Sequence, residues 1–593
     1  MSDYDCDVLI VGAGIAGAMI AYKAASQGLK VIILEAGIPF DARQAYIDAY
    51  YRDGWPWPSA ELAPSPADPG SDWKNPNDNY WVQSGPYGFD STYEVRAGGT
   101  TLHWLGTCMR FVPNDFKLNS YYKVSTAMDW PIDYAALEPW YTAAETEIGV
   151  AGDGTNQYAF EGPRSKPYPM PPIPASYLDQ QFGAKLNNTT VTLPANTGAK
   201  PITVPLNVGL TPQGRNSIVY DMRPSCMGNT SCVPICPIQA KYDATVHLGK
   251  ATALKTPAEI RYRSVVTGLT VDPSTADISG VTYIPWTGAG SKVKAGAAQT
   301  VTARRYVLAA HAIETVKILL MSPWRTVGGK TVTVANSSDQ VGRNLMDHIC
   351  NVVWGSVPQP VYPYRGPLST SGIENFRDTP LRSQYAAFRI EIGNDGWSWP
   401  TGAPQTTVAD IVKTQGLYGA ALRQAVGQAG STQFRLALEL ESIADPISRV
   451  TLSAYKDDLG LPRPQLNYHL TDYTLNGWVA SVDAANQIFS LLGATNATTV
   501  DKTAPGYFQY QGKDYQYRGA GHCIGTYRMG NDAKSSVVDG MQKSHDHGNL
   551  YLVGSGTFPT TGTANPTLTI AALALRTAAA IVAELAVNAG ART

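Results

Sequence analysis

The stretch "DVLIVGAGIAGAMIAYKAASQG", residues 7–28, decides the fold of this chain. An apolar run of strand length leads directly into a glycine-rich turn, after which apolar residues recur with helical spacing. Gly12, Gly14 and Gly17 form a G-x-G-x-x-G pattern. The first glycine allows a tight turn, the second lets the backbone approach a pyrophosphate, and the third lets helix and strand pack closely. Because a helix N-terminus favours negative charge, this strand, turn and helix predict a dinucleotide site in an α/β fold.

A second predicted strand, "KVIILEAG", ends at Glu35, which lies 21 residues after Gly14. An acidic residue at this position binds ribose hydroxyls and disfavours a 2′-phosphate. The pattern therefore predicts FAD or NAD rather than NADP, and does not choose between the first two.

Composition excludes one class of partner. The 593 residues carry 46 Lys and Arg against 48 Asp and Glu, so the net charge of −2 gives no reason to expect nucleic-acid binding. Charged residues make up 16% of the chain, below the roughly 25% of an average protein, which favours a large core. Length alone allows about four domains of roughly 150 residues.

Three of the seven cysteines fall within "PSCMGNTSCVPICPIQAKYDA", residues 224–244. Cys226, Cys232 and Cys236 have the spacing C-x5-C-x3-C, and Pro237 follows the last, as in ferredoxin patterns. Soft thiolates suit iron–sulfur ligation. Two other interpretations remain open at this point. The three cysteines could be free thiols in a surface loop, or they could bind zinc together with a distant fourth ligand such as His247. The other four cysteines are spread too thinly for a disulfide framework.

Neither end of the chain predicts a membrane segment. The start, "MSDYDCDVLIVGAG", has no basic region and no cleavage site, so we expect no secretory signal. The apolar stretch at 566–587 is interrupted by Arg576 and Glu584, and we expect a buried helix of a globular domain rather than a membrane span.

Three further stretches carry a family resemblance: "VRAGGTTLHWLG" at 95–106, "GHCIGTYRMG" at 521–530, and "NLYLVGSGTFPTTGTANPTLTIAALALRTA" at 549–578. With the N-terminal turn, they resemble the glucose-methanol-choline (GMC) family of FAD oxidoreductases over essentially the whole chain. The resemblance implies a Rossmann-like FAD-binding domain and a discontinuous antiparallel-sheet substrate-binding domain. We expect residues 1–110, 210–346 and 515–593 in the first, with the cysteine loop, and residues 111–209 and 347–514 in the second.

Within the second domain, "QFRLALELES" at 433–442 and "YHLTDYTLNGW" at 468–478 are interpreted as strands covering the substrate side of the flavin. The segment 55–79, rich in Pro, Asp and Trp, is expected near the cavity mouth. The FAD contacts implied by the resemblance are Gly12, Gly14, Gly17, Glu35, Ala36, Arg96, Gly98, Gly99, Thr100, Val266 and Thr563.

Oxidising an alcohol requires a base for the hydroxyl proton while hydride leaves for the flavin, and neutral histidine is the usual base. The resemblance assigns this role to His522 and makes Asn565 the residue that orients the hydroxyl. Without the resemblance, the sequence favours a buried structural histidine for His522 and a turn residue before Pro566 for Asn565.

The other histidines receive lesser roles. His103 lies near the flavin or serves packing, and His348 is interpreted as structural. His311 and Ser555 stand where many relatives carry other residues. His545 and His547 resemble a metal-ligand pair, but a polar turn is the better interpretation.

The cysteine stretch resembles the large catalytic subunits of membrane-linked FAD sugar and polyol dehydrogenases. That resemblance implies a 3Fe-4S cluster on Cys226, Cys232 and Cys236, and a sugar or polyol substrate. It also implies a small chaperone-like subunit with a twin-arginine signal, a multihaem cytochrome c subunit, and a periplasmic location without a membrane span of its own. An oxygen-using sugar oxidase and a non-catalytic electron-transfer flavoprotein remain as alternatives.

Overall fold

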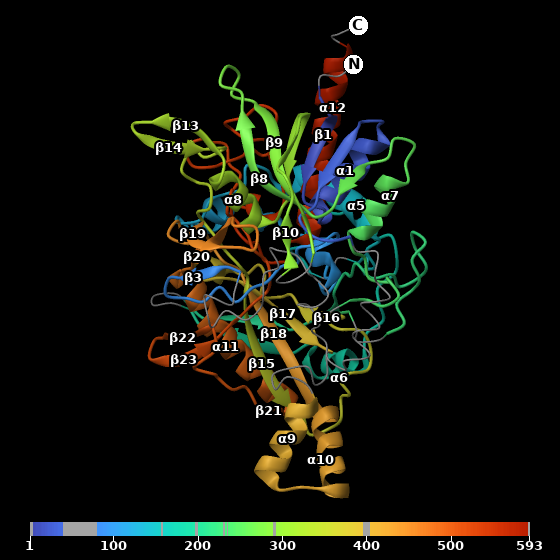
Figure 1. Ribbon diagram of the computed structural model, residues 1–593. Helices are drawn as coiled ribbons and strands as arrows, with labels where there is room; N and C mark the ends of the chain where they lie inside the picture. Colours follow the sequence, from blue (N-terminus) through green and yellow to red (C-terminus); the bar gives the residue numbers. More distant parts are fainter. Residues whose placement is uncertain are drawn as a thin grey trace.

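The computed structural model describes residues 4–39, 80–155, 158–195, 200–228, 232–233, 235–288, 292–394 and 404–590. The segment 55–79, expected near the cavity mouth, lies outside these residues. The molecule is elongated, with a parallel sheet in the upper half of Figure 1, an antiparallel sheet in the lower half, and both chain ends at the top.

A five-stranded parallel sheet is built from the beginning, middle and end of the chain. The predicted strand at 7–11 is its centre, and Val8 pairs with Val31 on one side and Arg305 on the other. The residues of this central strand are almost entirely buried, as expected for a parallel sheet that is covered on both faces. This confirms the predicted α/β fold class. The strand order is β25 (Leu550–Leu552), β12 (Ala303–Leu308), β1 (Cys6–Val11), β2 (Val31–Leu34) and β7 (Glu259–Arg261).

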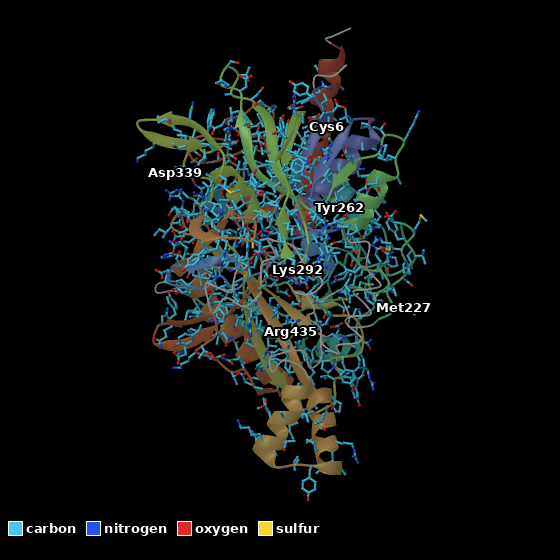
Figure 2. All side chains as sticks on the ribbon, in the orientation of Figure 1. Cys6, Met227, Tyr262, Lys292, Asp339 and Arg435 are labelled. Atoms are coloured by element: carbon cyan, nitrogen blue, oxygen red, sulfur yellow. The ribbon has the colours of Figure 1, made fainter. Side chains whose placement is uncertain are left out.

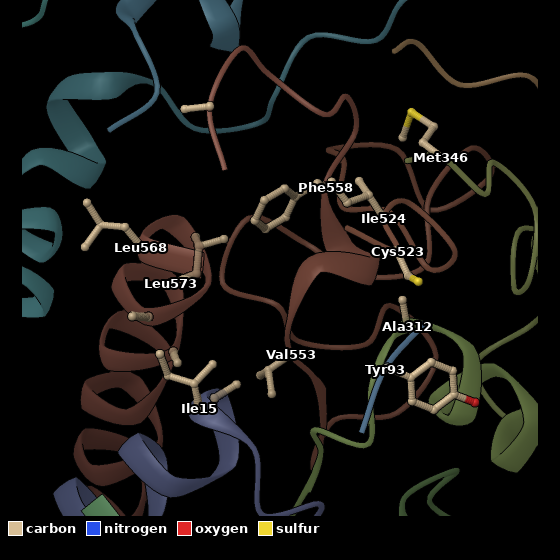
Figure 3. Packing of buried hydrophobic residues seen from close by; sticks show 14 of the residues in the cluster. Ile15, Tyr93, Ala312, Met346, Cys523, Ile524, Val553, Phe558, Leu568 and Leu573 are labelled. Carbon is tan, nitrogen blue, oxygen red and sulfur yellow. The ribbon is translucent and has the colours of Figure 1, made fainter. Parts of the chain in front are cut away.

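Three helices cover the glycine-rich end of this sheet. Helix α1 (Ile15–Ser26) packs against α12 (Thr567–Gly590), which in turn packs against α5 (Tyr134–Ile148). Figure 3 shows Ile15 of α1 beside Val553, which follows β25, with Leu573 higher on the neighbouring α12. By length and apolar composition alone, Thr567–Val587 could cross a membrane, but half of it is buried inside the protein. A helix is therefore present where the sequence predicts one.

A seven-stranded antiparallel sheet forms the lower half of the molecule. Strand β18 (Gln433–Leu440), predicted from its alternating pattern, lies between β15 (Ile349–Ser356) and β17 (Phe388–Gly393). The other strands are β21 (Thr495–Asn496), β16 (Ser371–Ile373), β6 (Val208–Leu210) and β24 (Arg518–Gly519), which pairs with β15.

The predicted strand at 468–478 is wrong. Helix α11 (Asp472–Leu492) begins there, with the hydroxyl of Thr471 capping the backbone N–H of Thr474. Leu475 and Trp478 are both buried at helical spacing. A threonine cap followed by apolar residues three apart outweighed the β-favouring aromatic residues.

Smaller elements complete the fold. A second antiparallel sheet contains β8 (Ser264–Val271), β9 (Ile278–Thr287), β10 (Lys294–Ala295) and β11 (Gln299–Val301). A mixed sheet contains β19 (Arg449–Lys456), β20 (Pro462–Asn467) and β3 (Val82–Ser84), with β20 antiparallel to β19 and parallel to β3. The hairpins are β4 (Thr190–Leu193) with β5 (Ile202–Pro205), β13 (Pro323–Val327) with β14 (Lys330–Thr333), and β22 (Tyr507–Tyr510) with β23 (Lys513–Gln516). The remaining α-helices are α4 (Leu118–Tyr122), α6 (Tyr177–Leu186), α7 (Thr245–Thr252), α8 (Ala312–Leu320), α9 (Pro404–Gln415) and α10 (Gly419–Thr432).

Candidate active site

A cavity of about 540 Å³ runs from the parallel sheet to the antiparallel sheet. One end is lined by Gly12, Gly14 and Glu35, which follow β1 and β2, and the other by Glu439 of β18 and by His522. The elongated site therefore joins the predicted dinucleotide turn to the predicted catalytic histidine.

The three glycines of the turn differ in what a side chain would meet. Gly12 has a φ of +102°, and a Cβ there would lie 2.6 Å from the carbonyl oxygen of Ala309. A Cβ on Gly17 would lie 2.1 Å from the carbonyl oxygen of Gly12. A Cβ on Gly14 meets no atom within 4 Å, because this residue faces the cavity. Gly12 and Gly17 thus permit the turn and its packing. Gly14 leaves open the space that a pyrophosphate would fill.

Glu35 holds the turn from the end of β2. Its two carboxylate oxygens accept hydrogen bonds of 2.8 Å from the backbone N–H groups of Ala13 and Gly37. Burial raises the pKa of this carboxyl, while both hydrogen bonds act in the opposite direction. Each oxygen keeps a lone pair for a ribose hydroxyl.

The other predicted FAD contacts fall into two groups. Ala36, Arg96, Gly99, Thr100 and Val266 line the cavity, and the N–H of Gly98 donates to the carbonyl of Ala13 in the turn. Thr563 instead directs its hydroxyl to Asp115, 3.0 Å away, and is not part of the cavity lining. The volume and donors of the cavity fit a flavin dinucleotide.

The structure brings His522 and Asn565 together at the far end of the cavity. His522 follows β24, and its backbone N–H donates to Asp347 at 2.9 Å. Asn565 immediately precedes Pro566 and α12. His522 Nε2 and Asn565 Nδ2 are 3.5 Å apart, although the residues are 43 positions apart in the chain.

The neighbours of this pair determine where a neutral His522 carries its proton. Arg389 donates to Asn565 Oδ1 at 3.4 Å, which leaves the amide Nδ2 facing His522. An amide nitrogen only donates, so His522 Nε2 accepts and the proton lies on Nδ1. His348 Nε2 lies 3.2 Å from the carbonyl oxygen of Gly562 and must donate to it. His348 Nδ1 can then accept from His522 Nδ1, 3.1 Å away, which leads independently to the same tautomer.

Charged side chains from the antiparallel sheet surround this pair. Glu439 Oε1 lies 3.3 Å from His522 Nδ1. Burial disfavours the charge of Glu439, but the hydrogen bond and charge of His522, together with His348 and Arg389, hold its pKa below the usual range. Burial lowers the pKa of His348 to about 4 and raises that of Asp347 to about 6. At neutral pH, an ionised carboxylate (Glu439) and a neutral imidazole (His348) therefore both lie next to Nδ1 of His522.

The wall beyond His522 is polar and comes from three strands of the antiparallel sheet. Glu391 of β17 accepts a hydrogen bond of 3.1 Å from Arg435 of β18. Cys350 and Val352 of β15 complete this part of the lining. Figure 2 shows Arg435 in the lower half of the molecule, among these strands.

Sequence reasoning missed Glu439, Arg389 and Glu391. In β17 and β18 these residues alternate with large apolar residues such as Phe388 and Leu438, which face the core. The sequence pattern that could have identified them is the alternation itself, since one face of each strand is apolar and the other carries Arg and Glu. Because alternate residues of a strand face opposite sides of the sheet, this pattern predicts a cavity on the polar side.

Of the remaining histidines, only His103 and His311 line the cavity. His103 Nδ1 lies 3.4 Å from Glu94, and His311 stacks on Tyr93 with ring centroids 4.0 Å apart. His547 is committed elsewhere, since its Nε2 accepts from the N–H of Ala335.

His545 contacts the hydroxyl of Ser536 at 3.0 Å. These partners agree with a polar turn rather than a metal-ligand pair for His545 and His547.

The three cysteines lie in a separate loop, and within the described part of the chain none of them forms a disulfide. Cys232 and Cys236 are buried and Cys226 is half-buried. The backbone N–H of Gly228 donates to Cys226 Sγ at 3.4 Å. Burial raises the pKa of the Cys226 thiol, while that N–H and a nearby arginine lower it.

The zinc interpretation of this loop finds no support in its geometry. Both ring nitrogens of His247 are occupied, by Tyr242 at 2.8 Å and Glu147 at 3.1 Å. Thiolates on one tetrahedral zinc ion would be about 3.8 Å apart, given Zn–S bonds of about 2.3 Å. Within the described part of the chain, three possible metal-ligand atoms of His, Cys, Asp or Glu lie within 4.8 Å of one another only at His348, Glu439 and His522, which are not in this loop.

Comparisons with known proteins agree with the geometry. The sequence profile of GMC oxidoreductases matches residues 445–574, and that of FAD-dependent oxidoreductases matches residues 7–45. The chain is 33% identical to the fructose dehydrogenase large subunit of Gluconobacter japonicus, over 98% of both chains. It is 25% identical to paromamine 6′-oxidase of Streptomyces fradiae, over 98% of this chain and 92% of that one.

Among solved structures, pyridoxine 4-oxidase from Mesorbium loti has the same fold. Its TM-score is 0.58 at 18% identity, with 97% of this chain and 98% of that chain covered. The similarity spans both sheets.

Proposed function

The chain belongs to the GMC oxidoreductase family, and from this premise we propose that it is an FAD-dependent dehydrogenase that oxidises a hydroxyl group of a sugar, glycoside or polyol. The observation that carries the proposal is the pairing of His522 with Asn565 at one end of a cavity whose other end is the glycine-rich turn. The name of the fructose dehydrogenase relative supports the substrate class.

FAD would be held by the turn at Gly12–Gly17, by Glu35, and by the lining residues Arg96, Gly99 and Val266. When bound, the flavin supplies the acceptor for the hydride that leaves the substrate carbon. His522 Nε2 would accept the hydroxyl proton, because it carries no proton in this tautomer and both His522 and Asn565 line the cavity. Glu439 stabilises the imidazolium that results, and Asn565, fixed by Arg389, donates to the hydroxyl oxygen from its amide.

The substrate wall supports a neutral, hydroxyl-rich substrate. Glu391 and Arg435 form an ion pair that offers acceptors and donors side by side, as vicinal hydroxyls require. An ionised acid would bring a negative charge close to Glu391 and Glu439.

We further propose that Cys226, Cys232 and Cys236 hold a 3Fe-4S cluster, which would supply a one-electron acceptor. The chemistry of three thiolates in one loop supports this assignment, as does the loop's position at the molecular surface, where Figure 2 shows Met227. A small chaperone-like subunit with a twin-arginine signal, a multihaem cytochrome c subunit and a periplasmic location complete the proposal. The words "large subunit" in the relative's name support partner subunits.

The test is anaerobic addition of sugars and polyols to the purified protein, with flavin absorbance and low-temperature electron paramagnetic resonance recorded together. We expect one substrate class to bleach the flavin absorbance. This bleaching should be lost in His522→Asn and retained in the control His545→Asn. A three-iron signal that disappears with the same substrate is expected alongside. Unchanged bleaching in His522→Asn would refute the assigned base. Iron-free protein that bleaches and then produces peroxide rapidly in air would favour the oxidase instead.

A further inference from the structure

Two buried cations lie against Cys232. Arg215 and Lys241 are each about 1% exposed and face each other across an isolated antiparallel bridge. Arg215 Nη1 donates to the sulfur of Cys232 at 3.4 Å, and Lys241 Nζ donates to its carbonyl oxygen at 2.6 Å. One cysteine therefore contacts both positive charges.

Neutral oxygens supply most of the other contacts of these cations. Arg215 Nη2 donates to Gln213 Oε1 and to the carbonyls of Leu368 and Ser369, at 2.6 to 2.7 Å. Lys241 donates to the carbonyls of Leu102 and Trp104. Among the described residues, neither cation forms an ion pair with a carboxylate.

Burial lowers the pKa of Lys241 and the charge of Asp243 raises it, but the oxygens of Asp243 accept hydrogen bonds from Thr245 and Gln239. Two desolvated positive charges with neutral partners are costly unless an anion lies close by. The thiolates of the cysteine loop are in the position to be that anion.

We propose that Lys241 and Arg215 are positioning residues that raise the reduction potential of the iron–sulfur group on Cys226, Cys232 and Cys236, an inference that rests on the proposed function. A cluster held by three thiolates is an anion, and reduction adds one further negative charge. Nearby buried cations stabilise the reduced form more than the oxidised form, because the interaction grows with the charge and little water screens it. The N–H to sulfur bond from Arg215 acts in the same direction.

Lys241 also links the cysteine loop to the flavin cavity. Trp104, which lines the cavity, accepts from Lys241 through its carbonyl and donates from its indole to the carbonyl of Tyr242 at 2.7 Å. A compact ammonium with three donors suits three carbonyls converging from two loops, where a planar guanidinium would not. The same ammonium group therefore contacts the lining of the flavin cavity, at Trp104, and the cysteine loop, at Cys232.

The experiment is a potentiometric titration of the holoenzyme with redox mediators, following the three-iron signal by electron paramagnetic resonance. Lys241→Met and Arg215→Gln each remove a buried charge. Lys250→Met is the matched control, since this partly exposed lysine of α7 pairs with Asp221 at the surface. We expect a more negative midpoint potential in the first two variants, no shift in the control, and substrate-dependent flavin bleaching at the wild-type rate in all three.

Each outcome decides a different point. A variant with wild-type iron content and an unshifted midpoint potential would overturn the inference and leave the cluster proposal standing. If Lys241→Met purifies without iron, the potential of Arg215→Gln decides by the same criterion. Wild-type protein without iron or sulfide would instead remove the relay from the proposed function, and this inference with it.

Discussion

In the proposed reaction, Glu439 of β18 stabilises the protonated His522, and its charge is the feature to test. Burial disfavours its charge, but the hydrogen bond and charge of His522 and the guanidinium of Arg389 outweigh burial and hold the pKa of Glu439 below its usual range. We expect Glu439→Gln to reduce kcat about 10- to 100-fold, because the protonated base loses its ionised neighbour. The acid side of the kcat/KM profile should also move to lower pH, since imidazolium becomes less favourable.

Glu439→Asp is the conservative control and should recover part of the rate. The measurement is substrate-dependent flavin reduction by stopped flow across pH 5 to 9. A uniform loss of rate in Glu439→Gln with an unmoved pH profile would show that the carboxylate only holds Arg389 in place.

His348 links the same site to acid stability. Burial lowers its pKa to about 4, whereas the unfolded chain has the ordinary value of 6.5. Below pH 6.5 the unfolded chain therefore binds a proton that the folded protein does not, so stability falls as the pH falls toward 4. Between pH 7.5 and pH 5 this amounts to about 2 kcal/mol.

His348→Gln should lose about that much less stability over the same interval. The measurement is urea unfolding of wild type and variant at both pH values, followed by tryptophan fluorescence. The opposite trend of Asp347, whose pKa is raised to about 6, is common to both proteins and cancels in the comparison. An identical pH dependence in the two proteins would contradict the assignment.

At the scale of elements, the turn between β1 and α1 separates folding from cofactor binding. Gly17→Ala would place a Cβ 2.1 Å from a backbone oxygen, so we expect little soluble protein. Gly14→Ala meets no atom within 4 Å, so we expect a folded protein that purifies without FAD, because the methyl group occupies the pyrophosphate space.

Solubility, thermal unfolding of the FAD-free protein and flavin absorbance distinguish the two variants. FAD-loaded Gly14→Ala with wild-type affinity would contradict the assignment of the pyrophosphate site.

Elements with strong local patterns were predictable from the sequence, and long-range pairs were not. The strands at 7–11 and 31–34 follow from short apolar runs, and the helix at 567–590 follows from a long apolar stretch after Pro566 that contains only Arg576 and Glu584 as charged residues. The strand expected at 468–478 failed because aromatic residues suit both a strand and a capped helix. Glu439 could not be assigned to His522 from sequence, since 83 residues separate them and only the sheet register brings them together.

At the scale of the whole molecule, the cavity and the cysteine loop are different regions joined through Trp104 and Lys241. Electrons that enter at the cavity would have to leave near Cys226, and the surface there is unusually apolar. Val219 is 70% exposed, Met222 fully exposed and Met227 75% exposed. Exposed apolar residues gathered in one segment mark an interaction surface.

We therefore expect this segment, residues 218–227, to contact the proposed cytochrome c subunit. Replacing both Val219 and Met222 by lysine should raise the KM for a cytochrome c acceptor about tenfold or more. The wild-type protein buries apolar side chains on docking, whereas the double variant would have to bury two charges. The kcat/KM for ferricyanide, which needs no apolar docking surface, should stay unchanged. The matched control replaces Val412 and Tyr418 by lysine, since these are exposed in the α9–α10 hairpin at the bottom of the molecule in Figure 1, whereas Met227 lies on its side at mid-height in Figure 2. Equal losses in both double variants, or an equal loss with both acceptors, would show that the segment is not the site of electron exit.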